Sequence, residues 1–212
     1  MNALFVTGTD TGVGKTWVAL RLLHALRGER CRAAGFKPVE CGSRDDGRAL
    51  HAATADPQTT LDEVNPLSIA EPVAPLSAPG APPIDFSFLG QCLDRLSSRH
   101  DYVIVEGAGG WLVPIDAERR FADLAMEWKL PVVLVAANRL GVLNHTLLTV
   151  EAIRSRGCEC RQVILNDLPG VPGEDCSRES NYDALVAVLP GIPLVRTRDL
   201  DWGDLARGLF RP

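Results

Sequence analysis

The stretch GTDTGVGKT, residues 8–16, combines three glycines with a final Lys-Thr pair, which is typical of loops that bind phosphate. Its glycines let the backbone approach an anion closely, its lysine can reach the terminal phosphates of a nucleotide, and its last hydroxyl can bind Mg²⁺. An apolar run precedes the loop and an amphipathic pattern follows it, as a strand and a helix would. The sequence therefore predicts a nucleotide site at Thr11, Gly12, Val13, Gly14, Lys15 and Thr16.

The spacing of this loop is unusual. The strict phosphate-loop pattern has four residues between its two glycines, whereas Gly8 and Gly14 enclose five. Thr9 stands where the first glycine would fall. Since the flanking strand and helix are both indicated, we interpret the loop as a variant phosphate loop and not as a chance cluster of small residues.

Further charged residues follow other apolar runs. Lys37 ends the run CRAAGFKPV and could reach phosphate, although a lysine at such a position is often simply solvated. Asp45 and Asp46 lie in a loop that enters a helix, where an aspartate can either cap the helix or bind Mg²⁺. Because carboxyl ends of parallel strands meet at one edge of a sheet, these side chains are candidates for one site.

The run DYVIV ends in Glu106, and a glycine-rich turn follows it. Phosphate-loop enzymes usually carry an acidic residue at the end of such a strand, where it reaches the metal directly or through water. Glycines at this position let the backbone pass close to phosphate. We therefore predict nucleotide and metal contacts at Glu106, Gly107, Ala108 and Gly109.

Asn166 and Asp167 follow the run QVIL, and the signal they give is weaker. An amide presents a donor and an acceptor together, so it can pair with the edge of adenine. The same residues are common turn formers. For Asn138, which follows VVLVAA, we favour the turn.

The elements that position these residues read as alternating strands and helices. Strands are predicted at 3–8, 31–39, 101–110, 130–138 and 161–168, and helices at 15–29, 86–98, 121–129 and 144–157, the last capped by Asn144. The strands are apolar on both faces, which is typical of a parallel sheet covered on both sides. We predict an α/β fold, a doubly wound and mostly parallel sheet of the phosphate-loop NTPase type, as a single domain over 1–212. The proline-rich stretch 71–86 is expected to be an ordered surface excursion.

Composition narrows the possible functions. The net charge of −5 gives no basic footprint for nucleic acid, and no apolar stretch reaches the roughly 20 residues that cross a bilayer. No secretory leader is visible, and six cysteines match neither a zinc pattern nor a redox pair. We expect a cytoplasmic protein that binds neither nucleic acid nor membrane.

Taken together, FVTGTDTGVGKT, AAGFKPV, VNPLSIAEPVAP, VIVEGAGGWLVP and LGVLNHTLLT resemble the ATP-dependent dethiobiotin synthetases, whose phosphate loop has the same five-residue gap. The resemblance covers most of the chain. It implies a homodimer that converts 7,8-diaminopelargonate, CO₂ (or bicarbonate) and ATP to dethiobiotin, ADP and phosphate. The expected route is a carbamate that ATP phosphorylates and the second amine then attacks.

The resemblance also implies roles for residues. Lys37 and Lys15 are the expected catalytic residues, and Thr16, Asp46 and Glu106 the expected Mg²⁺ ligands, with spacing favouring Asp46 over Asp45. Cys41 stands where the family commonly has a substrate-contacting serine, and a thiol donates more weakly. Asn166 and Asp167 would contact adenine, which Ile192, Pro193 and Leu194 would line. The partner subunit's helix start would bind the substrate carboxylate, through Gly141, Val142, Leu143 and Asn144.

Two other classes share parts of this pattern. A regulatory ATPase of the chromosome-partitioning or septum-positioning type carries an extra lysine five residues before the main one, where this chain has Asp10. It would also need an amphipathic basic tail for membrane binding, which is not seen. A small-molecule kinase is disfavoured by VEGAGGW and LGVLNH.

Overall fold

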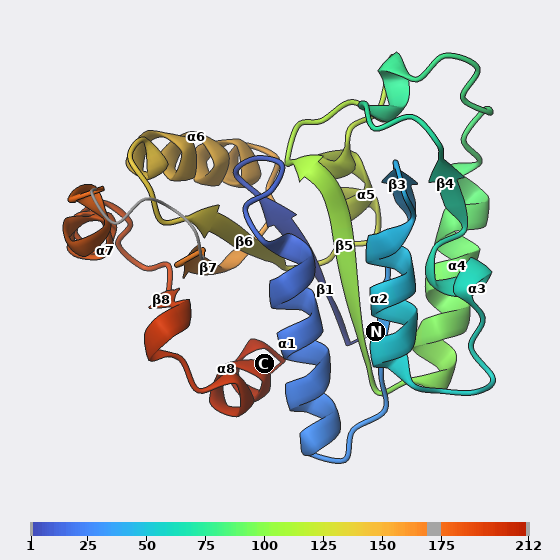
Figure 1. The fold of residues 1–212 in the computed structure, drawn as a ribbon, viewed down its shortest axis with the longest axis horizontal. Coiled ribbons are helices and arrows are strands. Elements are labelled where there is room, and N and C mark those ends of the chain that lie inside the picture. Colours follow the sequence, from blue (N-terminus) through green and yellow to red (C-terminus); the bar gives the residue numbers. More distant parts are fainter. Residues whose placement is uncertain (1, 169–174, 211–212) are drawn as a thin grey trace.

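The computed structural model describes residues 2–168 and 175–210, which form a parallel sheet with helices on both faces. The strand order is β2-β5-β1-β6-β7-β8, and every neighbouring pair is parallel (Figure 1). The predicted α/β fold is therefore confirmed. The strands are β1 (Ala3–Gly8), β2 (Ala33–Phe36), β5 (Tyr102–Gly110), β6 (Val132–Ala137), β7 (Cys160–Asn166) and β8 (Leu194–Arg196).

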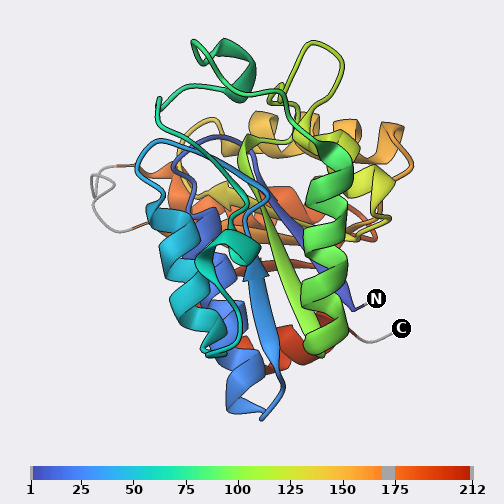
Figure 2. The same cartoon turned by 90° about the vertical axis from the view of Figure 1, so that its right-hand side faces the viewer.

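The helices divide between the two faces of the sheet. Figure 2 shows α1 and α2 on one side of β2 and β5, and α4 on the other. Buried residues of α8 belong to the same core as those of α1 and α2, and buried residues of α5, α6 and α7 belong to the same core as those of α4. The bounds are α1 (Lys15–Gly28), α2 (Asp45–Thr54), α3 (Leu61–Val64), α4 (Phe86–Arg99), α5 (Phe121–Glu127), α6 (Val142–Ser155), α7 (Ser177–Val188) and α8 (Trp202–Leu209).

Successive side chains of each strand point to opposite faces of the sheet, so a separate hydrophobic core forms on each face. In β1, Leu4 and Val6 face the α1 side, whereas Phe5 faces the α4 side, and all three are fully buried. This two-sided burial explains why the strands contain few polar residues. The main exceptions lie at the carboxyl ends of the strands, where the site forms.

The chain leaves the main sheet at Lys37 and Pro38. The strand predicted over 31–39 is in fact two strands, β2 and the short β3 (Val39–Cys41), because Pro38 has no backbone N–H for a sheet ladder. β3 pairs with β4 (Leu67–Ile69) in a separate two-stranded sheet. Lys37 thus lies at the junction of the two sheets.

Other boundaries also differ from those predicted. α6 begins at Val142, and its N-cap is Gly141 with φ of 92°, so the prediction that Asn144 caps this helix was wrong. The proline-rich segment is an excursion with one 3₁₀ turn at Pro75–Ser77. In the C-terminal part, where we predicted no elements, lie α7, β8, α8 and a 3₁₀ turn at Thr197–Asp199.

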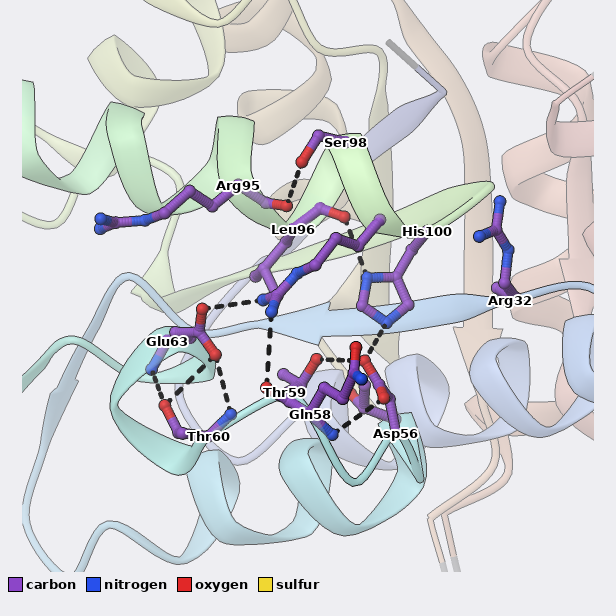
Figure 3. Close-up of polar contacts among 12 residues, drawn as sticks. Arg32, Asp56, Gln58, Thr59, Thr60, Glu63, Arg95, Leu96, Ser98 and His100 are labelled. Atoms are coloured by element: carbon purple, nitrogen blue, oxygen red, sulfur yellow. Dashed lines mark hydrogen bonds and ion pairs between the residues drawn. The ribbon is translucent and has the colours of Figure 1, made fainter.

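A polar cluster joins α3, α4 and the loop before α3 (Figure 3). His100 is buried, with Nδ1 2.9 Å from the carbonyl oxygen of Leu96 and Nε2 3.4 Å from a carboxylate oxygen of Asp56. Arg99 pairs with Glu63 at 2.8 Å, and Glu63 also closes a capping box with Thr60. This cluster lies at the far end of the sheet from the phosphate loop, and it fixes the loop at 55–60.

Candidate nucleotide-binding site

The phosphate loop connects β1 to α1 and is shaped by two left-handed glycines. Gly12 and Gly14 have φ of 72° and 96°, a region that favours glycine. Gly14 is also the N-cap of α1, and neither a capping side chain nor an acidic residue occupies the first turn. The helix therefore keeps its positive end and its unpaired N–H groups for an anion.

Lys15 folds back over this loop. Its Nζ lies 3.2 Å from the carbonyl oxygen of Asp10, and only 7% of the residue is exposed. Burial, together with the nearby charge of Lys37, lowers the pKa of Lys15 to about 8. A phosphate group would supply the negative charge that this ammonium lacks.

Lys37 is the centre of the site. Its Nζ donates to Glu106 Oε1 at 2.6 Å, to Asp46 Oδ2 at 2.9 Å and to the carbonyl oxygen of Gly107 at 3.2 Å. Burial alone would lower the pKa of Lys37, but the charges of Glu106 and Asp46 outweigh it and raise this pKa. Lys37 is thus a cation fixed beside the phosphate loop.

The structure distinguishes the two neighbouring aspartates. Asp46 points at Lys37, and although its partial burial acts against ionisation, the charge of Lys37 holds the pKa of Asp46 below its usual value. Asp45 instead faces solvent, where it bonds Ser43 and pairs with Arg48. Asp46 is therefore the carboxylate that shares the site with Lys15, Lys37 and the loop.

Thr16, Asp46 and Glu106 offer oxygen atoms suited to Mg²⁺. The Thr16 hydroxyl donates to Glu106 Oε1 at 2.8 Å, and Glu106 Oε2 is buried without a hydrogen-bond partner. An unpartnered buried carboxylate oxygen is costly unless a ligand completes it. Within residues 2–168 and 175–210, no three His, Cys, Asp or Glu side chains could hold a metal alone. The set fits Mg²⁺ bound partly by phosphate oxygens, as is usual for this ion.

These groups, except the fully buried Glu106, line a cavity of about 500 Å³. Cys41, the predicted substrate contact, is one of the lining residues, and burial raises the pKa of its thiol. Ala108 and Gly109 follow Glu106 along one wall, and the segment 72–75 forms another. The remaining lining residues are Thr11, Gly12, Gly14, Lys15, Thr16, Lys37, Glu40, Asp46 and Val113.

Asn166 lies behind the loop. Its side-chain nitrogen donates to the carbonyl oxygen of Val13 at 2.9 Å, and its oxygen accepts from the Thr197 hydroxyl at 3.3 Å. A methyl carbon added at Gly14 would overlap that amide nitrogen. In this structure Asn166 therefore supports the phosphate loop with both ends of its amide.

Asp167 belongs to a buried polar network. Asn138 donates to it at 2.6 Å, and Arg178 and Arg196 each approach within 3.5 Å. Asn138 is 1% exposed and also accepts from Asn181, so it is a network residue and more than the turn former that we predicted.

Two predicted groups do not line this cavity. Leu194 pairs with Val163 at the amino end of β8, so Ile192–Leu194 lie away from the carboxyl ends of the strands, which carry the site. Arg196 and Thr197, at the other end of β8, lie nearer Asn166. The segment Gly141–Asn144 begins α6, whose later residues Leu148, Thr149 and Ala152 line a second cavity of about 450 Å³. That cavity shares Thr11 and Val113 with the first.

Sequence reasoning missed Glu40, which lies on β3 and accepts from the backbone of Asp46 and Gly47. It also missed Asn65, whose fully buried amide donates to the carbonyl oxygen of Lys37 at 2.8 Å. The only sequence signal for Glu40 is an acidic residue three positions after Lys37. Nothing in the spacing marked Asn65.

Fold and site together define a phosphate-loop nucleotide-binding protein. A family model described as "AAA domain" matches residues 2–197. Three solved structures support the fold alone. A GTPase from Pyrococcus abyssi has a TM-score of 0.63 and 15% identity, and the match covers 99% of this chain and 96% of that one. A putative plasmid partition protein from Borrelia burgdorferi has a TM-score of 0.58 and 11% identity, with 98% and 96% of the two chains covered. The MinD cell division protein of Aquifex aeolicus has a TM-score of 0.57 and 12% identity, with 100% and 95% covered.

Sequence comparison is more specific. The chain is 45% identical to the ATP-dependent dethiobiotin synthetase BioD of Akkermansia muciniphila over 79% of each chain. It is 38% identical to the protein of that name from Anaeromyxobacter sp. (strain K) over 97% of each. The chain belongs to the dethiobiotin synthetase family and is an enzyme of the ligase class. No helix in the described part of the chain is long and apolar enough to cross a membrane.

Proposed function

We propose that this enzyme uses ATP and Mg²⁺ to carboxylate 7,8-diaminopelargonate with CO₂ and to close the ureido ring of dethiobiotin. The observation that carries the proposal is that Lys15, Lys37 and Asp46 line one cavity beside the phosphate loop, where Lys37 also pairs with the fully buried Glu106. Family membership supports the choice of reaction. The active site would lie within a single domain of the chain, in the cytoplasm.

The reaction has three steps. One amine of the substrate adds to CO₂ and loses a proton, which gives a carbamate. A carbamate oxygen then attacks the γ-phosphorus of ATP, and ADP leaves. Finally the second amine attacks the carbonyl carbon of this mixed anhydride and loses a proton, phosphate leaves and the ring closes.

The two lysines would neutralise the anions that these steps bring together. Carbamate and triphosphate repel each other, and Lys15 on the loop and Lys37 beside it supply fixed positive charge at that point. When bound by Thr16, Asp46 and Glu106, Mg²⁺ would further screen the phosphate oxygens. To accept phosphate, Lys37 exchanges one of its present carboxylate contacts for the ligand.

The adenine contact proposed for Asn166 and Asp167 has a structural condition. Both ends of the Asn166 amide are engaged by Val13 and Thr197, so reading a base would require it to exchange one of these partners. Thr197 follows β8 and bonds Asn166, whereas Leu194 pairs with Val163 further from the strand ends. The residues around Thr197 are therefore better placed than Ile192–Leu194 to form the wall of an adenine pocket.

We also propose a homodimer in which the start of α6 from the partner binds the substrate carboxylate. Leu112, Leu140 and Leu148 are 44%, 80% and 58% exposed, and two of them line the second cavity. A second copy of the chain would cover these leucines. The α6 amino end, capped by Gly141, is suited to an anion.

The decisive experiment measures ADP release by purified protein with Mg-ATP, with and without 7,8-diaminopelargonate and bicarbonate. We expect release that needs both co-substrates, with dethiobiotin identified by mass spectrometry. ATP hydrolysis indifferent to both would instead favour a regulatory ATPase and overturn the proposal.

A further inference from the structure

The start of α2 has no cap of its own. Its N-cap residue, Arg44, has φ of 61° and no side-chain hydrogen bond to the first turn. The first N–H groups of a helix need acceptors from outside the helix. Two of them find acceptors on Glu40 of β3, since Oε1 accepts from Asp46 N at 2.9 Å and Oε2 from Gly47 N at 2.8 Å. Glu40 therefore caps α2 from a neighbouring strand.

The residue that Glu40 holds by its backbone is the one whose side chain meets Lys37. Asp46 Oδ2 lies 2.9 Å from Lys37 Nζ, and Glu40 follows Lys37 by three positions in the chain. One carboxylate thus links the strand that follows Lys37 to the helix that carries Asp46, across the turn at 42–44.

Helix capping alone does not explain a buried carboxylate here. Glu40 is 4% exposed, and in the described part of the chain it has no Lys, Arg or His within salt-bridge distance. Asn, Ser or Thr can cap a helix without the cost of burying a charge. A carboxylate that accepts two adjacent N–H bonds, one on each oxygen, fixes both the distance and the rotation of the first turn.

We propose that Glu40 is a positioning residue for Mg²⁺ and nucleotide, because it orients the Asp46 carboxylate toward Lys37 and the phosphate loop. This role rests on the proposed function, in which Asp46 is a metal ligand. The Glu40 carboxylate bonds the backbone N–H groups of Asp46 and Gly47, so its effect on the metal would pass through Asp46. Its loss is expected to raise the Mg²⁺ concentration that nucleotide binding requires, while the protein still folds.

The test is a Mg²⁺ titration of the binding of a fluorescent, non-hydrolysable ATP analogue, followed for the wild type, Glu40→Gln and Glu40→Ala. In Glu40→Ala, we expect the Mg²⁺ concentration at half-maximal binding to rise about 10-fold, as is usual when a residue that orients a metal ligand is lost. Glu40→Gln keeps one acceptor, so its shift should be smaller. Binding of the analogue without Mg²⁺ should not change, since the phosphate loop is untouched.

Asp85→Ala is the matched control. The Asp85 side chain also caps a helix, α4, by accepting from Phe88 N at 2.9 Å, but it does not line the cavity. The Asp85→Ala variant should lose thermal stability, but its Mg²⁺ concentration at half-maximal binding of the analogue should not shift. Unshifted midpoints in both Glu40 variants, or an equal shift in Asp85→Ala, would overturn the role of Glu40. If Glu40→Ala does not fold, Glu40→Gln decides.

The same titration separates this inference from the proposed function. A wild-type protein that shows no Mg²⁺-dependent binding of the analogue would overturn both. Normal binding by the wild type with no shift in the variants would overturn the role of Glu40 alone.

Discussion

The ammonium group of Lys37 lies 2.6 Å from Glu106 Oε1, and both side chains are almost completely buried. β5 carries Glu106, and Lys37 follows β2, the neighbouring strand of the same sheet. The pair therefore depends on the register of the two strands. A buried charge is tolerated only when it is paired and hydrogen-bonded, so Lys37 and Glu106 each offset the cost of burying the charge of the other.

This pairing makes Lys37→Ala a test of both stability and activity. The variant should lose turnover, and it should lose roughly 3–5 kcal/mol of unfolding free energy because Glu106 is left buried without its cation. ADP release and urea denaturation measure the two effects. Lys129→Ala, at the third and last lysine of the chain, should change neither. A Lys37→Ala variant with near-normal rate would remove Lys37 from the mechanism.

The lowered pKa of Lys15 predicts how pH affects nucleotide binding. In the free protein this amine loses its proton near pH 8, whereas in the unfolded chain it stays charged to about 10.5. Above pH 8, ATP must bind together with a proton, so its affinity should fall by up to about tenfold per pH unit. Stability of the free protein moves the opposite way, rising between pH 8 and 10.5, because there the unfolded chain binds more protons.

Calorimetry at pH 7, 8 and 9, in buffers that differ in ionisation enthalpy, would measure this proton uptake directly. Lys15→Arg keeps its charge over the whole range and should therefore show no such pH dependence. Equal affinities for the wild type at pH 7 and 9 would contradict the assignment.

The close approach of Gly14 to Asn166 predicts a strong local coupling. Gly14→Ala places a side chain at φ of 96° and against the Asn166 amide, and each of these effects costs about 1–3 kcal/mol. Asn166→Ala removes the steric clash but not the backbone strain, so the double variant should recover part of the stability. A double-mutant cycle by chemical denaturation measures the coupling. Strict additivity would show that the two residues do not interact.

The proposed dimer predicts that Leu148→Glu shifts the protein toward monomer and lowers turnover, because a charge would enter the covered apolar face. Light scattering after gel filtration measures the mass. Val186→Glu on α7, at a valine that is 51% exposed and outside the second cavity, is the control and should leave both unchanged. A wild type that is monomeric at assay concentration would contradict the dimer.

The sequence predicted the fold well where the signals are local and strong. Apolar strands followed by polar strand ends indicated the parallel sheet and predicted that Lys15, Lys37 and Glu106 lie at one edge of it. It failed at Pro38, where the missing donor ends one strand and a new sheet begins. It also failed for Glu40 and Asn65, because the partners of both side chains are backbone atoms, and a backbone partner leaves no mark on the pattern of residue types.

The proline-rich segment has a consequence for how the cavity keeps its shape. Pro72 and Pro75 line the cavity in a stretch whose only regular element is the 3₁₀ turn at Pro75–Ser77. A proline ring fixes φ already in the unfolded chain, so little conformational entropy is left to lose when this wall forms. The covalent structure of the two prolines therefore restricts the backbone of this wall before folding, and replacing the exposed Pro72 would give the unfolded chain more conformational freedom to lose.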